Sequence, residues 1–69
     1  MILNKCQAEA VYNAMCALNN VSMRVEAHIG SAVVYETTSG AVVVDAYAVG
    51  SERYETQHAF AVAYGLQDE

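Results

Sequence analysis

The segment GSERYETQHAFAVAYGL, residues 50–66, decides the fold because it fits two secondary structures. Large and small side chains alternate along it, so that a strand would place the large ones on one side and the small ones on the other. As a helix, it begins at Ser51, a good N-cap residue. The helix would also place Glu52 and Glu55 near its start, where the helix dipole favours negative charge.

The connection to the preceding segment favours the helix. A two-residue turn at Gly50-Ser51 would bring Arg53 and Glu55 beside small apolar residues of the core face, and a longer loop would leave a strand much longer than its partner. We therefore expect one compact α+β domain over residues 1–69: an N-terminal helix, a three-stranded antiparallel meander and a C-terminal helix over residues 52–66. The alternative is a helix plus a four-stranded antiparallel sheet.

Residues 5–18 are predicted to form the first helix. Asn4 is a candidate N-cap, and Gln7 stands where a capping box places its second residue. Asn19 and Asn20 tolerate the left-handed conformation of a C-cap and end the helix. Apolar residues recur at helical spacing and predict the buried face: Val11, Ala14, Met15 and Leu18.

Three strands are expected over residues 22–29, 32–38 and 41–49, separated by turn signals. Gly-Ser at residues 30–31 suits a two-residue hairpin of type II′, and Thr-Ser-Gly at residues 38–40 suits a three-residue loop whose glycine is left-handed.

These turns set the register, and the register assigns each side chain to one face of the sheet. The face expected toward the core is apolar apart from Glu36, and its other members are Met23, Val25, Ala27, Ile29, Ala32, Val34, Val42, Val44, Ala46 and Ala48. The face expected to point outward is mixed, and it holds Arg24, Glu26, His28, Val33, Tyr35, Thr37, Ala41, Val43, Asp45 and Tyr47.

A protein interface is the candidate site. Its centre would be an apolar cluster on the outward face, made by Val33, Tyr35, Val43 and Tyr47. Tyrosine is enriched at protein interfaces, and contiguous apolar patches on small proteins mark such surfaces. Four carboxylates are expected to meet basic residues of the partner, namely Glu36, Asp45, Glu52 and Glu55.

The charge of the chain disfavours direct contact with nucleic acid. The formal net charge is −5, with three basic residues against eight acidic ones, and the excess lies in residues 36–69. Such a chain lacks the basic surface that neutralises phosphates, whereas it suits a basic protein surface. The first residues hold too short an apolar run for a membrane span. We expect a cytoplasmic protein.

No motif predicts catalysis, a cofactor or a metal. Cys6 and Cys16 lie about 15 Å apart along one helix, too far for a disulfide. With His28 and His58 they show no spacing of zinc ligands, and the four glycines form no phosphate-binding loop. An enzyme is therefore not expected.

The expected order of one helix, three antiparallel strands and one helix is similar to that of double-stranded-RNA-binding domains. The segment GSERYETQHAFAVA, residues 50–63, occupies the place of their final helix. Where those domains carry a lysine cluster, this chain has Glu52, Arg53 and Glu55. The resemblance implies a divergent domain that has lost its basic residues.

We expect a non-enzymatic protein-binding module. Small acidic chains without a site are typical of phage or mobile-element inhibitors that sterically block a host nucleic-acid-handling complex, as anti-CRISPR proteins do. Besides the RNA-binding-like domain, the alternative is a structural homo-oligomer that buries the same sheet face, or an unpaired edge strand, against a copy of itself.

Overall fold

The first helix, α1, spans Lys5–Asn19 in a computed structural model that describes residues 2–68. The predicted capping box is confirmed: the Gln7 N–H donates to Asn4 Oδ1 at 2.8 Å, and the Asn4 N–H donates to Gln7 Oε1 at 3.0 Å. These bonds satisfy two of the backbone donors that a helix start leaves free. Asn20 is the C-cap, as expected, although its conformation is right-handed.

Four strands follow α1 and form one antiparallel sheet in the order β1-β2-β3-β4. They are β1 (Glu26–Ile29), β2 (Ala32–Glu36), β3 (Val42–Ala46) and β4 (Gly50–Tyr54). Both predicted hairpins are confirmed. In the first, Ile29 pairs with Ala32 and Gly30 has φ +60°. In the second, the Thr37 N–H donates to the Ala41 carbonyl at 2.9 Å, and Gly40 is left-handed with φ +89°.

The segment at residues 50–66 forms both predicted structures in succession. Its first part is β4, so the alternative with four strands is confirmed, and the expectation of one helix over residues 52–66 is wrong. Thr56 then caps a shorter helix, α2 (Gln57–Ala63), by accepting the Ala59 N–H at 3.0 Å. The alternation of large and small residues therefore describes a real strand, which ends where a threonine can start a helix.

The loop before β4 explains how the strand avoids burying Arg53. β3 ends at Ala46, three residues earlier than expected, and residues 47–49 form the connection, so that Ala46 pairs with Gly50. The three-residue connection replaces the two-residue turn at Gly50-Ser51 that was considered from the sequence. This change moves each side chain of β4 to the opposite face of the sheet. Glu52 and Tyr54 then face the helices and Arg53 faces outward.

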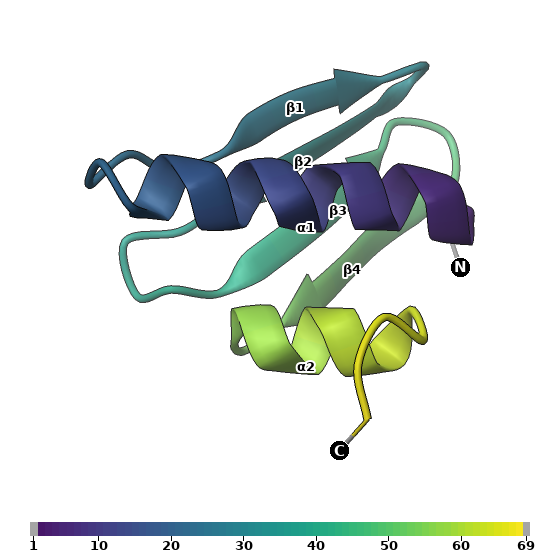
Figure 1. The fold of residues 1–69 in the computed structure, drawn as a ribbon. Coiled ribbons are helices and arrows are strands. Elements are labelled where there is room, and N and C mark those ends of the chain that lie inside the picture. The colour runs from purple at the N-terminus through teal and green to yellow at the C-terminus, as the bar shows by residue number, and fades with distance from the viewer. Residues whose placement is uncertain (1, 69) are drawn as a thin grey trace.

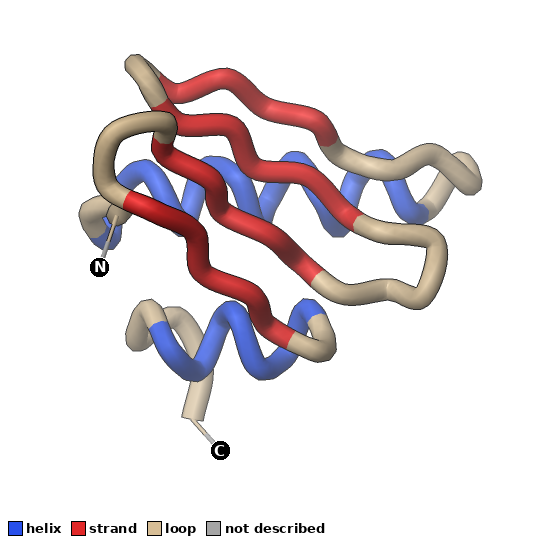
Figure 2. The backbone as a smooth tube through the Cα atoms, turned by 180° about the vertical axis from the view of Figure 1, so that it is seen from behind, coloured by secondary structure: helices blue, strands red, loops and turns tan. Residues whose placement is uncertain are grey.

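Both helices cover the same face of the sheet and leave the other face uncovered (Figures 1 and 2). The core lies between the helices and the sheet. Phe60 of α2 is fully buried at its centre and makes edge contacts with Tyr54, at 5.6 Å between ring centroids. The other fully buried large side chains are Met15, Val34, Val42 and Val44.

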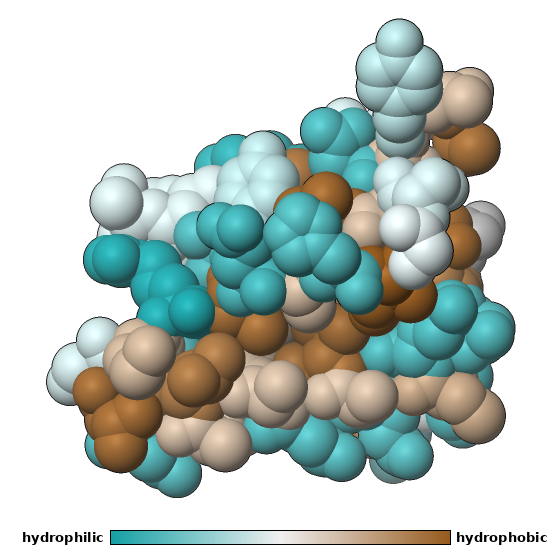
Figure 3. All heavy atoms as spheres, turned by 90° about the horizontal axis from the view of Figure 1, so that it is seen from above, coloured by the Kyte–Doolittle hydropathy of each residue, from teal (hydrophilic) through white to brown (hydrophobic). Residues whose placement is uncertain are grey.

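Two residues expected in the core are at the surface, because their strands are shorter than predicted. β1 begins at Glu26, so Met23 lies in the preceding loop and is 56% exposed, near Val21 at 65%. Figure 3 shows apolar side chains gathered at this corner, at the end of α1. Ala48 is likewise exposed in the loop after β3.

Candidate protein-interaction face

The face of the sheet that the helices leave uncovered is here called the open face, and Figure 2 shows the four strands from this side. Two transverse rows follow from the strand pairing. One row is Glu26, Tyr35, Val43 and Arg53, and the other is His28, Val33, Asp45 and Ser51. Antiparallel sheets commonly expose one face to water, and that face is then mostly polar. Here the two middle strands contribute three apolar or aromatic side chains to it.

These three side chains, Val33, Tyr35 and Val43, are the part of the predicted cluster that the structure brings together. Tyr35 lies directly opposite Val43, and Val33 is two residues from Tyr35 on the same side of β2. Both valines are half-buried and Tyr35 is 37% exposed. The open face therefore has a continuous apolar centre without any helix over it.

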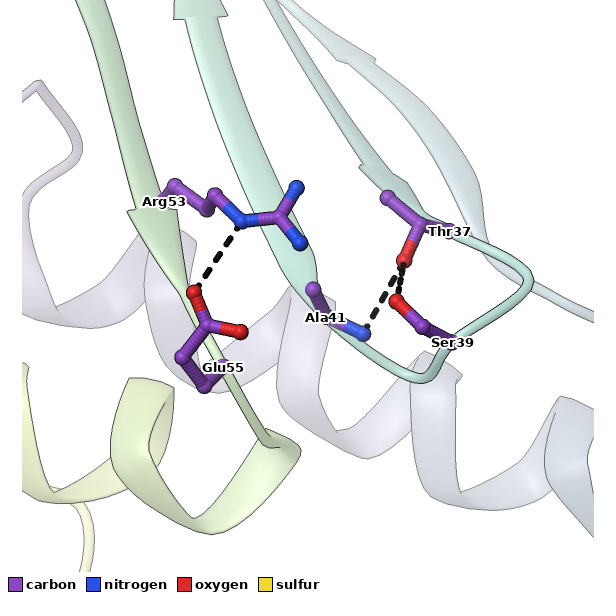
Figure 4. Close-up of polar contacts among 5 residues, drawn as sticks. All are labelled: Thr37, Ser39, Ala41, Arg53 and Glu55. Atoms are coloured by element: carbon purple, nitrogen blue, oxygen red, sulfur yellow. Dashed lines mark hydrogen bonds and ion pairs between the residues drawn. The ribbon is translucent and has the colours of Figure 1, made fainter.

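Charged side chains surround this centre. On β1, His28 Nε2 lies 3.5 Å from Glu26 Oε2. After β4, the Arg53 guanidinium donates to Glu55 Oε1 at 3.1 Å (Figure 4). Asp45 is exposed beside Val33 and has no ion-pair partner within residues 2–68. The open face thus has an apolar centre with a mildly acidic border.

A hydroxyl pair holds the loop at one end of the open face. The Ala41 N–H donates to Thr37 Oγ1 at 3.1 Å, and the Thr37 and Ser39 hydroxyls lie 2.9 Å apart (Figure 4). Side chains that bond to their own loop favour one loop conformation. The border of the open face is therefore ordered at this end.

Glu36, one of the carboxylates predicted to meet a partner, does not belong to the open face. As expected from its register, it points toward the helices. Its carboxylate accepts the Val25 N–H at 2.9 Å, the Asn19 amide at 3.1 Å and the Gln57 amide at 2.9 Å. The carboxylate thus links β2 to the segment before β1 and to both helices, and its acceptor positions are occupied.

Glu52, at the middle of β4, also points toward the helices. Its carboxylate accepts the Ile2 N–H at 3.1 Å and the hydroxyls of Tyr54 at 2.9 Å and Tyr64 at 2.5 Å. Burial raises the pKa of Glu52, but the bonds from Tyr64, Tyr54 and Ile2 outweigh it, and the net shift of the pKa is downward. Glu52 joins the N-terminal segment, β4 and α2.

The pKa values of the two tyrosines that donate to Glu52 shift in the opposite direction, upward. Burial, followed by the bond to the Glu52 carboxylate, raises the pKa of both Tyr54 and Tyr64. A phenol that donates to a carboxylate loses that bond when it ionises, and the two negative charges then repel. Both hydroxyls are therefore held as donors at neutral pH.

The expected placement of Tyr47 on the outward face of a strand is wrong, because Tyr47 lies in the loop between β3 and β4. It is 98% exposed, and Val49 in the same loop is 78% exposed. Of the eight predicted interface residues, five share the open face or its border: Val33, Tyr35, Val43, Asp45 and Glu55. The remaining three lie in this loop or on the helix-covered side.

Sequence reasoning omitted Arg53, Glu26 and His28 from the site, although they border the same apolar centre. Arg53 was missed because its segment was assigned to a helix. The alternation of side chains around it was the available signal. Glu26 and His28 are on the face that the sequence predicts, but the predicted site takes its charged residues only from positions 36–55 and therefore omits them.

Two shallow hollows lie away from the open face. One, of about 380 Å³, is lined by Asn19, Met23, Arg24, Glu36, Gln57 and neighbouring loop residues. The other, of about 390 Å³, runs along α2 beside His58 and Val62. Within the described part of the chain, no three His, Cys, Asp or Glu side chains are grouped as metal ligands would be.

Comparisons of this chain with protein-family models, with curated proteins and with solved structures found no match. None of the helices between residues 2 and 68 has both the length and the apolar character needed to span a bilayer. The observed order has four strands between the helices, one more than the double-stranded-RNA-binding order, and α2 begins with Gln57 and His58.

Proposed function

We propose that this chain is a non-enzymatic protein-binding module whose open face contacts a partner with a basic surface. The observation that carries the proposal is the apolar centre of the open face, made by Val33, Tyr35 and Val43 without a covering layer. An apolar centre with a polar border is the usual composition of a protein interface.

Charge complementarity indicates the kind of partner. The open face and its border carry Glu26, Asp45 and Glu55 against Arg53, which is already paired with Glu55. The whole chain has a net charge of −5. Such a surface attracts a basic one and repels nucleic acid, so we place the partner among proteins that bind nucleic acid through basic residues.

The mechanism that follows is steric occlusion. A chain of 69 residues that covers a basic surface of its partner would keep nucleic acid away from that surface. This is how a small cytoplasmic inhibitor from a phage or mobile element, of the anti-CRISPR kind, would act on a host nucleic-acid-handling complex. Such binding is predicted to weaken as salt rises, because counterions screen the acidic border.

The test compares the wild-type chain with a Tyr35→Ser/Val43→Ser variant. The first step identifies proteins that bind to the immobilised wild-type chain and not to the variant. The purified partner is then titrated with each chain by calorimetry at increasing salt. We expect the double substitution to weaken binding at least about tenfold, since central aromatic contacts dominate interfaces. Glu9→Gln on the exposed side of α1 is the matched control and is expected to bind normally.

Three results would contradict the proposal: equal binding by the wild type and the double variant, an affinity that does not change with salt, or a partner that binds nucleic acid equally well with the chain attached. Binding of duplex RNA by the wild type at low salt would instead favour the RNA-binding-like alternative.

A further inference from the structure

The outer edge of β1 is the second uncovered surface of the sheet. β1 pairs with β2 on one side, and among residues 2–68 no helix or strand lies beyond its other side (Figures 1 and 2). The opposite edge strand, β4, differs because α2 packs against it. An open strand edge presents unpaired N–H and carbonyl groups, which another strand can satisfy.

The direction of the backbone groups on β1 follows from one hydrogen bond. The Glu36 N–H donates to the Val25 carbonyl at 3.2 Å, so Val25 directs its backbone groups toward β2. These groups alternate in direction along an antiparallel strand. Ala27 and Ile29 therefore also face β2, whereas Glu26 and His28 direct their N–H and carbonyl groups outward.

We propose that the β1 edge pairs with the β1 edge of a second copy of this chain, antiparallel and about a two-fold axis. In the register that we infer, Glu26 lies opposite His28 of the second copy, and Ala27 lies opposite Ala27 of the second copy. Both outward residues of each β1 then exchange backbone hydrogen bonds with the other strand. The two four-stranded sheets become one continuous sheet.

The pairing of a carboxylate with an imidazole selects this register over its neighbours. Both Glu26 and His28 have exposed side chains on the open face, so each dimer would gain two equivalent Glu–His pairs across the axis. A shift of the register in one direction would place Glu26 opposite Glu26 of the second copy. A shift in the other direction would place the two His28 side chains together. Each shift also leaves one outward residue of β1 without its counterpart in the other strand.

The side of the sheet that faces the helices fits the same register. There, Ala27 meets Ala27 of the second copy, and Ile29 meets Val25 of the second copy. Ala27 and Ile29 are only partly buried in the single chain, although they pack against its core. Pairing would remove their remaining apolar surface from water, which favours association. In Figure 1, β1 projects beyond α1, so the edge is accessible to a second strand.

The dimer would join two open faces side by side and present two apolar centres in one plane. Its existence does not depend on the proposed partner, because the chain alone is tested. The first measurement is mass by sedimentation equilibrium from micromolar to millimolar concentration, together with amide hydrogen exchange by NMR. We expect a monomer–dimer equilibrium, with protection of the Glu26 and His28 amides that rises with concentration.

The second measurement is a charge-reversal series. His28→Glu places two carboxylates opposite each other at two symmetric positions, so dimerisation is expected to weaken about tenfold or more. Adding Glu26→Lys to that variant restores opposite charges at both positions and is expected to restore the dimer. Glu9→Lys, an exposed change on α1, is the matched control and is expected to leave the dimer unchanged.

Four outcomes would overturn the inference: a monomer at millimolar concentration, a dimer in which the Glu26 and His28 amides exchange freely, a dimer that His28→Glu does not weaken, or a double variant that dimerises no better than His28→Glu. A dimer with freely exchanging β1 amides that Tyr35→Ser/Val43→Ser dissociates would place self-association on the open face instead.

Discussion

The two faces of the sheet use the same residue type, glutamate, in different ways. On the helix-covered face, each of Glu36 and Glu52 accepts three hydrogen bonds from other parts of the chain. On the open face, Glu26 and Glu55 are exposed and each contacts one neighbour two residues away. Glu36 and Glu52 are half-buried, and a carboxylate that loses part of its contact with water is stabilised by protein donors, whereas an exposed one is hydrated.

This difference shows that the charge of the chain has two parts. Glu36 at the end of β2 and Glu52 in the middle of β4 connect segments that are distant in sequence, so their role is structural. The acidic groups at the border of the open face are exposed, and we propose that they contact a partner. The four carboxylates predicted from the sequence to meet a partner, Glu36, Asp45, Glu52 and Glu55, include members of both groups.

Loss of the aromatic centre on the covered face should have the largest effect on stability. Phe60→Ala removes a fully buried ring that contacts Tyr54 and Tyr64, and we expect it to cost about 3–5 kcal/mol of unfolding free energy. A domain of this size has a total stability of roughly that order. Urea unfolding followed by circular dichroism measures the change.

Tyr35→Ser on the open face is the control for Phe60→Ala and is expected to cost about 1 kcal/mol or less. Equal losses from the two variants would mean that the open face is covered in solution, for example by a second copy.

Glu52→Gln tests the carboxylate that joins three segments. The amide keeps one acceptor oxygen but loses the charge, so the three bonds from Ile2, Tyr54 and Tyr64 weaken. We expect a loss of about 1–3 kcal/mol. Glu55→Gln, an exposed neighbour, should change stability by about 0.5 kcal/mol at most. If both substitutions cost the same, the Glu52 bonds do not contribute to stability.

Unfolding at low pH is a second test of the contribution of the Glu52 carboxylate to stability. Because the pKa of Glu52 is lower in the folded chain than in the unfolded one, the unfolded chain binds this proton more readily. The resulting stability is present above the unfolded pKa of about 4.3 and is lost as pH falls below it. Glu52→Gln should therefore show a shallower loss of stability below pH about 4 than the wild type, measured by urea unfolding at each pH.

Tyr47→Ser should have the smallest effect, because this side chain is 98% exposed in the loop between β3 and β4. We expect a change within about 0.5 kcal/mol in either direction. Thermal unfolding of the two chains side by side measures it. A clear destabilisation would show that Tyr47 packs against the domain, and then the loop would belong to the folded core.

Features that depend on neighbouring residues were predictable. The capping box of Asn4 and Gln7 lies within one turn, and the hairpins at residues 30–31 and 38–40 require only local backbone conformations. The two hairpins set the register of the first three strands. This register predicted the open-face positions of Val33, Tyr35, Val43 and Asp45. The fourth strand was not the preferred prediction, because its register depends on the length of the connection at residues 47–49, which the sequence did not indicate.

The amino-acid sequence determined α1, the first two hairpins and the alternation that places an apolar strip on one side of the middle strands, since these depend on local geometry and side-chain periodicity. Only the tertiary structure decided the division of residues 50–66 into β4 and α2 and the roles of Glu36 and Glu52. The physical reason is that five of the six donors to Glu36 and Glu52 come from other segments of the chain, and periodicity carries no information about which remote groups will meet.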